Sequence, residues 1–211
     1  FRTPTKICVH GFLTINGKKM SKSRGTFITA QSYLQNLNPE YLRYYFASKF
    51  SAGVDDLDLN LDDFMQKVNS DLIGKIVNIA SRCSNFITKG NDGVLSTTIE
   101  DESLWLQITG AAESIANHYE NREFGKAMRA IMAQADAANE YIAFKEPWKL
   151  AKDPEQRQAV LDICSLGINM FRVLMVYLKP VLPAMSEVVE GFLNEKLSWS
   201  GLSQPLINHK I

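Results

Sequence analysis

Apolar residues recur at intervals of three and four positions over most of the chain beyond residue 60. The first of these stretches carries one apolar stripe, formed by Phe64, Val68, Leu72, Ile76, Ile79 and Ile87. A stripe at this spacing is typical of an amphipathic helix that buries one side. The same pattern predicts helices over residues 61–88, 101–120, 122–144, 154–179 and 183–194. Gly, Asn and Pro residues stand between these stretches, so the pattern predicts an antiparallel helical bundle.

The first sixty residues follow a different pattern. Residues 6–15 are apolar and rich in β-branched side chains, and they lead into Asn16-Gly17, a pair favoured in tight turns. We therefore predict one strand over 6–15. A modest helix is expected around 30–36, and Asn38-Pro39-Glu40 predicts the start of another, because Asn caps helices and Pro suits their first position.

Length and composition agree with a mainly α fold. The 211 residues are 45% hydrophobic and 22% charged, which suffices for one good-sized core or two small ones and excludes a disordered or collagenous chain. We divide the chain into residues 1–60 and an independently folding helical bundle over 61–211. The chain starts at Phe1, without Met, in a basic, strand-like stretch, which suggests a piece of something larger.

Charge is unevenly distributed along the chain. Lys and Arg total 23 and Asp and Glu total 23, so the formal net charge is zero and no global basic field indicates a nucleic-acid or membrane partner. The first 39 residues contain no acidic side chain, yet they carry the basic residues Arg2, Lys6, Lys18, Lys19, Lys22 and Arg24. We therefore predict a local anion site near the start of the chain.

Cysteine usage and hydropathy bear on location. Cys8, Cys83 and Cys164 lie far apart in the sequence, without the close pairs of a zinc site or a disulfide framework, so we expect a reducing cytoplasm and no metal. The longest apolar stretch, 159–178, is interrupted by polar residues that would be costly in a bilayer, namely Asp162, Asn169 and Arg172. We expect no membrane partner.

The segment Lys19-Met20-Ser21-Lys22-Ser23 has the chemistry of a phosphate-binding loop. It places two ammonium groups three residues apart, with a hydroxyl on each side of Lys22. Two positive charges can neutralise phosphate oxygens as a leaving pyrophosphate develops charge, while hydroxyls and backbone N–H groups donate hydrogen bonds. The alternative is an ordinary solvated loop of Lys and Ser.

The complete pentad KMSKS is identical to the second signature of class I aminoacyl-tRNA synthetases. Longer runs resemble the methionyl-tRNA synthetases in particular: FLTINGKKMSKSRGTFI (12–28), LRYYFASKF (42–50), DDLDLNLDDF (55–64), REFGKAMRAIMAQADAANEY (122–141) and CSLGINMFRVLMVYLKPVL (164–182). The resemblance implies the end of a catalytic α/β domain, the KMSKS loop and a small connecting segment over 1–60. It also implies an α-helical anticodon-binding domain over 61–211.

The resemblance also implies an activity and a set of ATP contacts. The intact enzyme would activate methionine with ATP and Mg²⁺ through an adenylate and transfer it to tRNA. Lys22 would be the main catalytic contact to the ATP phosphates and Lys19 would assist, with Met20, Ser21 and Ser23 completing the ATP-binding loop. The family's HIGH-type signature and methionine pocket are not found here, so we expect this chain alone to be inactive and without a cofactor. Zinc is expected only in an insert upstream of this chain.

Two helix positions suit recognition of a base. Asn78 and Arg82 are four residues apart and share one helix face, while the apolar series points elsewhere. Asn can pair with a base edge, and Arg can bind a base, stack on it or hold phosphate. The alternative is a solvated polar face. The run KIVNIASR (75–82) resembles the anticodon-reading helix of the methionyl enzymes, which implies that Asn78 and Arg82 bind the anticodon.

An aromatic residue completes the predicted tRNA contacts. Trp148 follows Pro147, which stops the preceding helix and can hold the ring at a fixed point. A Trp at a helix break also commonly covers a core. The run EPWKLAK (146–152) resembles the family, which implies that Trp148 stacks on the first anticodon base and that Pro147 shapes the approach. We assign Trp105 and Trp199 to packing.

Two rival interpretations remain from the sequence. KMSKS-type loops also occur in the leucyl, isoleucyl, valyl and cysteinyl enzymes, so the chain could come from one of these. A non-catalytic helical interaction module with a basic loop is the second rival. The sequence gives no oligomeric state and no affinity for tRNA.

Overall fold

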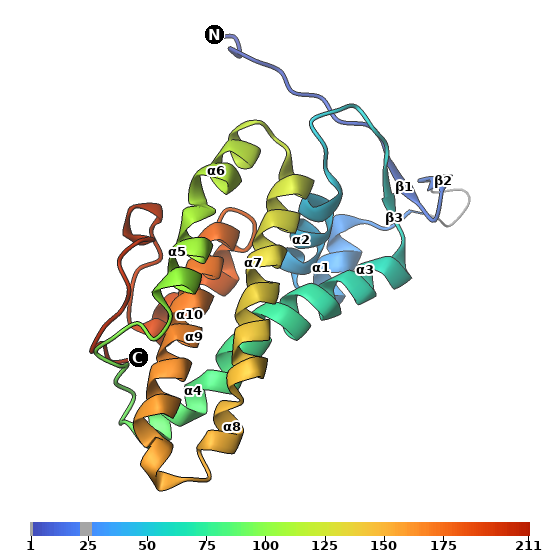
Figure 1. The fold of residues 1–211 in the computed structure, drawn as a ribbon. Helices are drawn as coiled ribbons and strands as arrows, with labels where there is room; N and C mark the ends of the chain where they lie inside the picture. Colours follow the sequence, from blue (N-terminus) through green and yellow to red (C-terminus); the bar gives the residue numbers. More distant parts are fainter. Residues whose placement is uncertain (1, 22–26) are drawn as a thin grey trace.

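We describe a computed structural model of the chain, in which residues 2–21 and 27–211 are placed. Figure 1 shows an elongated body of helices with a small sheet at one end. The helices of the body are α3 (Leu61–Val68), the π-helix η1 (Asn69–Val77), α4 (Asn78–Gly90), α5 (Glu102–Gly110), α6 (Ala112–Glu120), α7 (Phe124–Lys145), α8 (Pro147–Leu150), the 3₁₀ turn η2 (Pro154–Gln156), α9 (Arg157–Leu178), α10 (Pro183–Leu193) and the 3₁₀ turn η3 (Trp199–Gly201). The predicted mainly α fold with a helical bundle is confirmed.

Helix α9 forms the centre of the core. Every residue from Ile163 to Leu178 is buried, because α4, α7, α5 and α10 pack around it. The helical run Pro154–Leu178 is long and apolar enough to cross a membrane, but 83% of its most apolar window is buried inside the protein. It is therefore a core helix.

Two polar side chains of α9 hold the C-terminal tail. Asn169 donates to the carbonyl oxygen of Leu206 at 3.0 Å and accepts from its backbone N–H at 2.7 Å. The guanidinium of Arg172, only 2% exposed, donates to the carbonyl oxygens of Gly201, Leu202 and Gln204. The Asn169 amide and the two terminal nitrogens of Arg172 are thus paired with the backbone of the tail, which explains why these residues occur in an apolar helix. Arg172 Nε is buried without a partner among the described residues.

The helical body departs from the predicted pattern in two places. The stretch 61–88 is one continuous helical run, as expected, but its middle is the nine-residue π-helix η1. The predicted helix 101–120 is interrupted between α5 and α6, next to Gly110, and glycine is the weakest helix former after proline. The other predicted helices agree with the structure to within a few residues.

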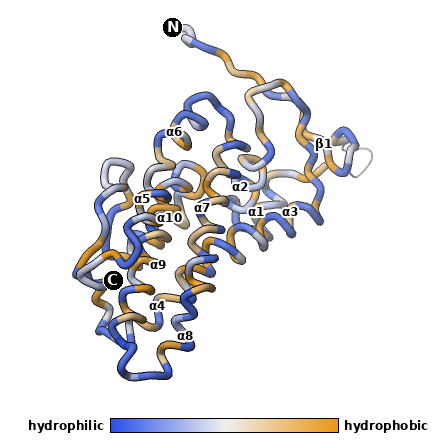
Figure 2. The backbone as a smooth tube through the Cα atoms, in the orientation of Figure 1, coloured by the Kyte–Doolittle hydropathy of each residue, from blue (hydrophilic) through white to orange (hydrophobic). Residues whose placement is uncertain are grey.

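The sheet has three short strands, β1 (Leu13–Ile15), β2 (Lys18–Lys19) and β3 (Leu57–Leu59), in the order β2-β1-β3. Strand β1 pairs antiparallel with β2 and parallel with β3. The predicted strand over 6–15 is therefore too long. Residues 6–12 have no regular secondary structure (Figure 2), with Ile7 76% exposed and Val9 66% exposed, although the His10 ring packs on Phe50 with 5.5 Å between ring centroids. No strand within the described residues pairs alongside most of this segment.

Helices α1 (Ala30–Asn36) and α2 (Pro39–Lys49) connect the sheet to the bundle, and both begin where predicted. The Asn38 side chain accepts from the backbone N–H of Glu40 at 2.9 Å and so caps α2. Helix α2 is fixed to the bundle at close range, because the Gly125 N–H of α7 donates to the Phe50 carbonyl at 2.8 Å. A Cβ atom at position 125 would lie 3.1 Å from that carbonyl oxygen, so glycine suits this approach.

Side chains of α2 also clamp the corner between α9 and α10. The Glu40 carboxylate accepts from the backbone N–H groups of Ala184 and Met185, at the start of α10. Arg43 donates to the carbonyl oxygens of Pro180 and Val181. The connecting segment and the far end of the chain are thus held together by charged groups paired with helix-terminal backbone.

Candidate functional site

The phosphate-loop candidates start at Lys19, the last residue of the second strand of a hairpin that the sheet holds in place. Asn16 and Gly17 connect β1 to β2 with φ values of 48° and 71°, the left-handed pair that a tight two-residue hairpin turn requires. The Asp58 carboxylate of β3 accepts from Gly17 N–H at 2.7 Å and from the Thr14 hydroxyl at 2.6 Å. The central sheet thereby fixes where the chain enters the loop.

The described part of the loop combines a cation with an apolar anchor. Lys19 is exposed on β2, and its ammonium lies 5.7 Å from the centroid of the Phe12 ring. Met20 is half-buried and packs against the core, and Ser21 is half-buried as well. Lys22 and Ser23 lie outside the described residues. The hairpin therefore places Lys19, Met20 and Ser21 at one end of the molecule.

The anticodon candidates come together toward the other end of the molecule, where the first part of α4 approaches α8 (Figure 1). The Arg82 guanidinium lies 5.5 Å from the centroid of the Trp148 ring, which is cation–π geometry. Trp148 is 37% exposed, whereas Pro147 is buried. Asn78 is half-buried one helical turn before Arg82. Segments about sixty residues apart thus meet in one small area.

Local backbone geometry places Trp148. Helix α7 ends at Lys145, the capping residue Glu146 has a left-handed conformation with φ 46°, and Pro147 then begins α8. The sharp turn brings the indole back toward α4, and the buried proline anchors it. The Glu146 carboxylate also pairs with the Lys149 ammonium at 2.7 Å across this turn.

Asn139 of α7 lies next to Asn78 and was missed by the sequence analysis. The Asn78 side-chain N–H donates to Asn139 Oδ1 at 3.1 Å. Asn139 in turn donates to the carbonyl oxygens of Lys75, at 3.0 Å, and Ala135, at 2.8 Å. An Asn in the middle of a helix otherwise lined with Ala was the available signal, because such a residue usually needs a specific partner.

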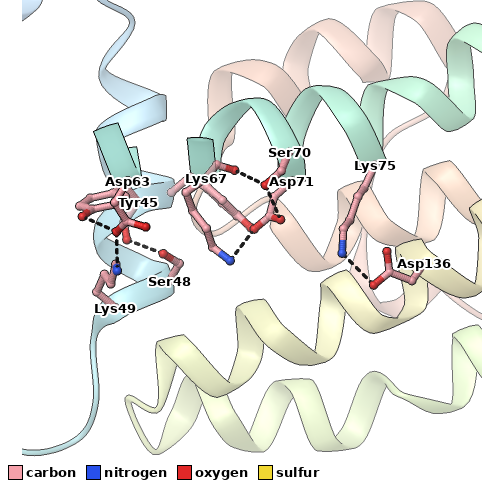
Figure 3. Close-up of polar contacts among 10 residues, drawn as sticks. Tyr45, Ser48, Lys49, Asp63, Lys67, Ser70, Asp71, Lys75 and Asp136 are labelled. Atoms are coloured by element: carbon pink, nitrogen blue, oxygen red, sulfur yellow. Dashed lines mark hydrogen bonds and ion pairs between the residues drawn. The ribbon is translucent and has the colours of Figure 1, made fainter. Parts of the chain in front are cut away.

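Three ion pairs lie in a row from α2 along α3 and η1 to α7 (Figure 3). They join Lys49 to Asp63 at 2.5 Å, Lys67 to Asp71 at 2.8 Å and Lys75 to Asp136 at 2.7 Å. Buried Tyr44 donates to Asp71 at 2.6 Å. Burial, and next the hydrogen bond to Asp71, raise the pKa of Tyr44 far above its usual range, so it stays a donor.

The other two tryptophans pack against neighbouring side chains. Trp105 is buried in the core, and Trp199 packs against Tyr177 with 5.4 Å between ring centroids. Over residues 2–21 and 27–211, no three His, Cys, Asp or Glu side chains are grouped as a metal ion would need.

Comparison with known families assigns both parts of the chain. The model described as "tRNA synthetases class I (M)" matches residues 1–84, which places the hairpin and the connecting helices in the class I synthetases. The model described as "Anticodon binding domain of methionyl tRNA ligase" matches residues 93–209, more than half of the chain. The chain therefore belongs to the methionyl-tRNA ligase family. This decides against the leucyl, isoleucyl, valyl and cysteinyl alternatives.

Solved structures have the same fold. Mycobacterium tuberculosis methionyl-tRNA synthetase in complex with methionyl-adenylate is 23% identical, with a TM-score of 0.85 over 95% of this chain. A second structure of that enzyme bound by methionyl-adenylate is 21% identical, with a TM-score of 0.86 over 95% of this chain. The chain spans 41% of the length of both structures.

Proposed function

We propose that the surface formed by Asn78, Arg82, Pro147 and Trp148 binds the anticodon loop of a methionine tRNA. The observation that carries this proposal is the contact between Arg82 and the half-exposed ring of Trp148. Unpaired bases in RNA loops bind by stacking on aromatic rings and by hydrogen bonds to their edges, and Arg serves base or phosphate. In this assignment Trp148 stacks on the first anticodon base, while Asn78 reads a base edge.

We assign a separate role to the segment Lys19-Met20-Ser21-Lys22-Ser23, which starts at the end of the hairpin: it binds the phosphates of ATP. The absence of Asp and Glu from the first 39 residues supports it, because neither the segment itself nor the sequence on either side of it carries a carboxylate that would oppose a polyphosphate. The loop itself therefore suits phosphate and offers no carboxylate to the accompanying Mg²⁺. Lys22, assisted by Lys19, would stabilise charge on the departing pyrophosphate.

The whole protein would join methionine to its tRNA in the cytoplasm, using ATP with Mg²⁺, and this chain alone would be inactive. The three cysteines, all free, suit a reducing compartment. The hairpin and α8 lie at opposite ends of the molecule (Figure 1), which supports separate contributions to ATP and anticodon binding.

Binding of an RNA stem-loop with the methionine anticodon CAU tests the anticodon surface. Trp148→Ala should weaken binding about 5- to 150-fold, the usual effect of removing one stacking aromatic. Trp199→Ala is the matched control, because both Trp rings are 37% exposed but Trp199 packs on Tyr177. Equal affinities of the wild type and Trp148→Ala would reject the proposal.

A further inference from the structure

We propose that Asn139 is a positioning residue that locks the amide of Asn78 in one orientation, so that the surface distinguishes bases with opposite donor and acceptor order. The inference rests on the proposed function, because it concerns how the anticodon surface selects its base. Asn139 lies on α7 and Asn78 on α4, so the lock joins two helices of the bundle.

The chemistry of its partners fixes the orientation of Asn139. Its Nδ2 group donates to the carbonyl oxygens of Lys75 and Ala135, which can only accept hydrogen bonds. The amide therefore cannot exchange its nitrogen and oxygen without placing an oxygen against two carbonyl oxygens. Its Oδ1 atom must point the other way and can only accept.

This acceptor then determines the orientation of Asn78. The Nδ2 group of Asn78 donates to Asn139 Oδ1 at 3.1 Å. Rotation of the Asn78 amide by half a turn would bring two oxygens together and lose the hydrogen bond. The position of Asn78 Oδ1, and of its second N–H, is consequently set by a residue on another helix.

Two contacts of Lys75 hold the backbone next to Asn78 against α7. Lys75 accepts from Asn139 through its backbone, and its ammonium also pairs with Asp136, one turn before Asn139 on α7. Figure 3 shows this ion pair crossing from η1 to α7. Two attachments to α7 hold the same turn of η1, directly before Asn78 begins α4.

Asn78 retains groups for a ligand after making this contact. Within the part of the chain that the structure describes, its Oδ1 atom has no hydrogen-bond partner and one N–H remains. Asn78 is half-buried, on the helix that carries Arg82 toward Trp148. An acceptor and a donor at fixed places, beside an aromatic ring, match one edge of an unpaired base.

A fixed amide can separate bases that a freely rotating one would confuse. Cytosine presents an amino donor beside a ring-nitrogen acceptor, whereas uracil presents a carbonyl acceptor beside a ring N–H donor in the same places. Adenine and guanine differ in the same way. Exchange of C for U, or of A for G, thus transposes donor and acceptor, and only a locked amide rejects the transposed base.

Asn139→Ala should therefore change selectivity more than affinity. A free Asn78 amide divides between two orientations, so binding of the correct loop should fall only about two-fold, in proportion to the competent fraction. Binding of one transposed loop should rise, and its discrimination should fall by roughly 5-fold or more. A purely structural role would weaken all loops by the same factor.

The experiment measures the binding of four stem-loops, with anticodons CAU, UAU, CGU and CAC, to the wild type, Asn139→Ala, Asn139→Asp and Asn78→Ala. Asn139→Asp replaces Nδ2 by a charged oxygen that faces the carbonyl oxygens of Lys75 and Ala135, so the carboxylate should leave the position from which Asn139 accepts the Asn78 N–H. It should therefore lose discrimination between the loops, as Asn139→Ala does. Asn139→Ala should lose discrimination at one anticodon position, the same position as in Asn78→Ala.

The outcomes separate this inference from the proposed function. If Asn78→Ala and Trp148→Ala both bind CAU as the wild type does, the anticodon surface itself is wrong. If both weaken binding while Asn139→Ala keeps every ratio between loops, only the positioning role is overturned. Loss of discrimination in Asn139→Ala at a different anticodon position from that in Asn78→Ala, with both folded, overturns it as well.

Discussion

The Arg82 guanidinium lies over the indole ring of Trp148, with 5.5 Å between Cζ and the ring centroid. Arg82 comes from α4 and Trp148 from α8, which follows the left-handed turn at Glu146. The contact places a cation and an aromatic ring in one small area, and these are the two groups that bind an unpaired base and its phosphate.

This contact predicts that the losses of binding free energy caused by substitutions at Arg82 and Trp148 will not be additive. Arg82→Met and Trp148→Ala should each weaken binding of a CAU stem-loop, and the double variant should lose about 0.5–1 kcal/mol less than the sum, the usual size of an exposed cation–π contact. Titration of the four proteins with one labelled stem-loop measures this coupling. Strict additivity would show that the two side chains act independently.

Salt dependence distinguishes the two side chains. The neutral ring of Trp148 releases no counterions, so Trp148→Ala should keep the wild-type dependence of log K on log salt. Arg82→Met should flatten that slope by about one if the guanidinium holds phosphate. An unchanged slope in Arg82→Met would assign the guanidinium to a base or to Trp148 instead.

The ion pairs of Glu190 should make the free energy of unfolding depend on pH in the acid range. Lys179 and Lys196, each 2.7 Å away, lower the pKa of the Glu190 carboxyl from its ordinary 4.5 to about 2. Because the folded-state pKa is the lower one, the stabilising contribution is complete above about pH 4.5 and disappears as the pH falls toward about 2. The wild type should therefore lose free energy of unfolding across this range.

Glu190→Gln isolates that contribution, because glutamine keeps an acceptor without the charge. Urea unfolding at about pH 6 and about pH 3 should show a larger acid-induced loss in the wild type than in Glu190→Gln. Other lowered carboxyl pKa values, such as that of Asp63 beside Lys49, act equally in both proteins. Parallel losses in the two proteins would mean that Glu190 does not contribute.

The sequence predicted those features that depend on local pattern. The start of α2 at Asn38-Pro39 and the helical run 61–88 were predicted correctly, because helix caps and apolar stripes depend only on residues close together in sequence. Strand β3 was missed because three residues carry too little pattern, and β1 was overextended because apolar residues do not reveal whether a partner strand exists. Asn139 was missed because its partners, Lys75 and Asn78, are about sixty residues away in sequence.

Lys22 should govern the ATP step in a protein that carries the complete catalytic domain. Lys22→Ala should slow methionine-dependent pyrophosphate exchange about 100- to 1,000-fold, because it removes charge stabilisation at the departing pyrophosphate. Methionine binding should change little. Lys18→Ala is the matched control, since Lys18 is an exposed lysine of the same hairpin, and it should stay within a few-fold of the wild type. Equal exchange rates in all three proteins would contradict the role of the loop.

Arg172 should stabilise the C-terminal tail. Its buried guanidinium donates to the carbonyl oxygens of Gly201, Leu202 and Gln204, and burial lowers its pKa. Arg172→Met keeps most of the apolar stem but leaves these carbonyls without their charged donor. The free energy of unfolding should fall by about 2 kcal/mol, the range for hydrogen bonds to charged groups.

Arg157→Met is the matched control for this change, because the exposed Arg157 also donates to a backbone carbonyl, that of Gly90. Its free energy of unfolding should change by no more than about 0.5 kcal/mol, as is usual at a surface position. Hydrogen exchange adds a local measurement: the amides of Leu202 and Gln204 should exchange faster in Arg172→Met, since the tail opens before the core does. Equal stability of the two variants, with unchanged exchange in the tail, would show that Asn169 and apolar packing hold the tail without the guanidinium.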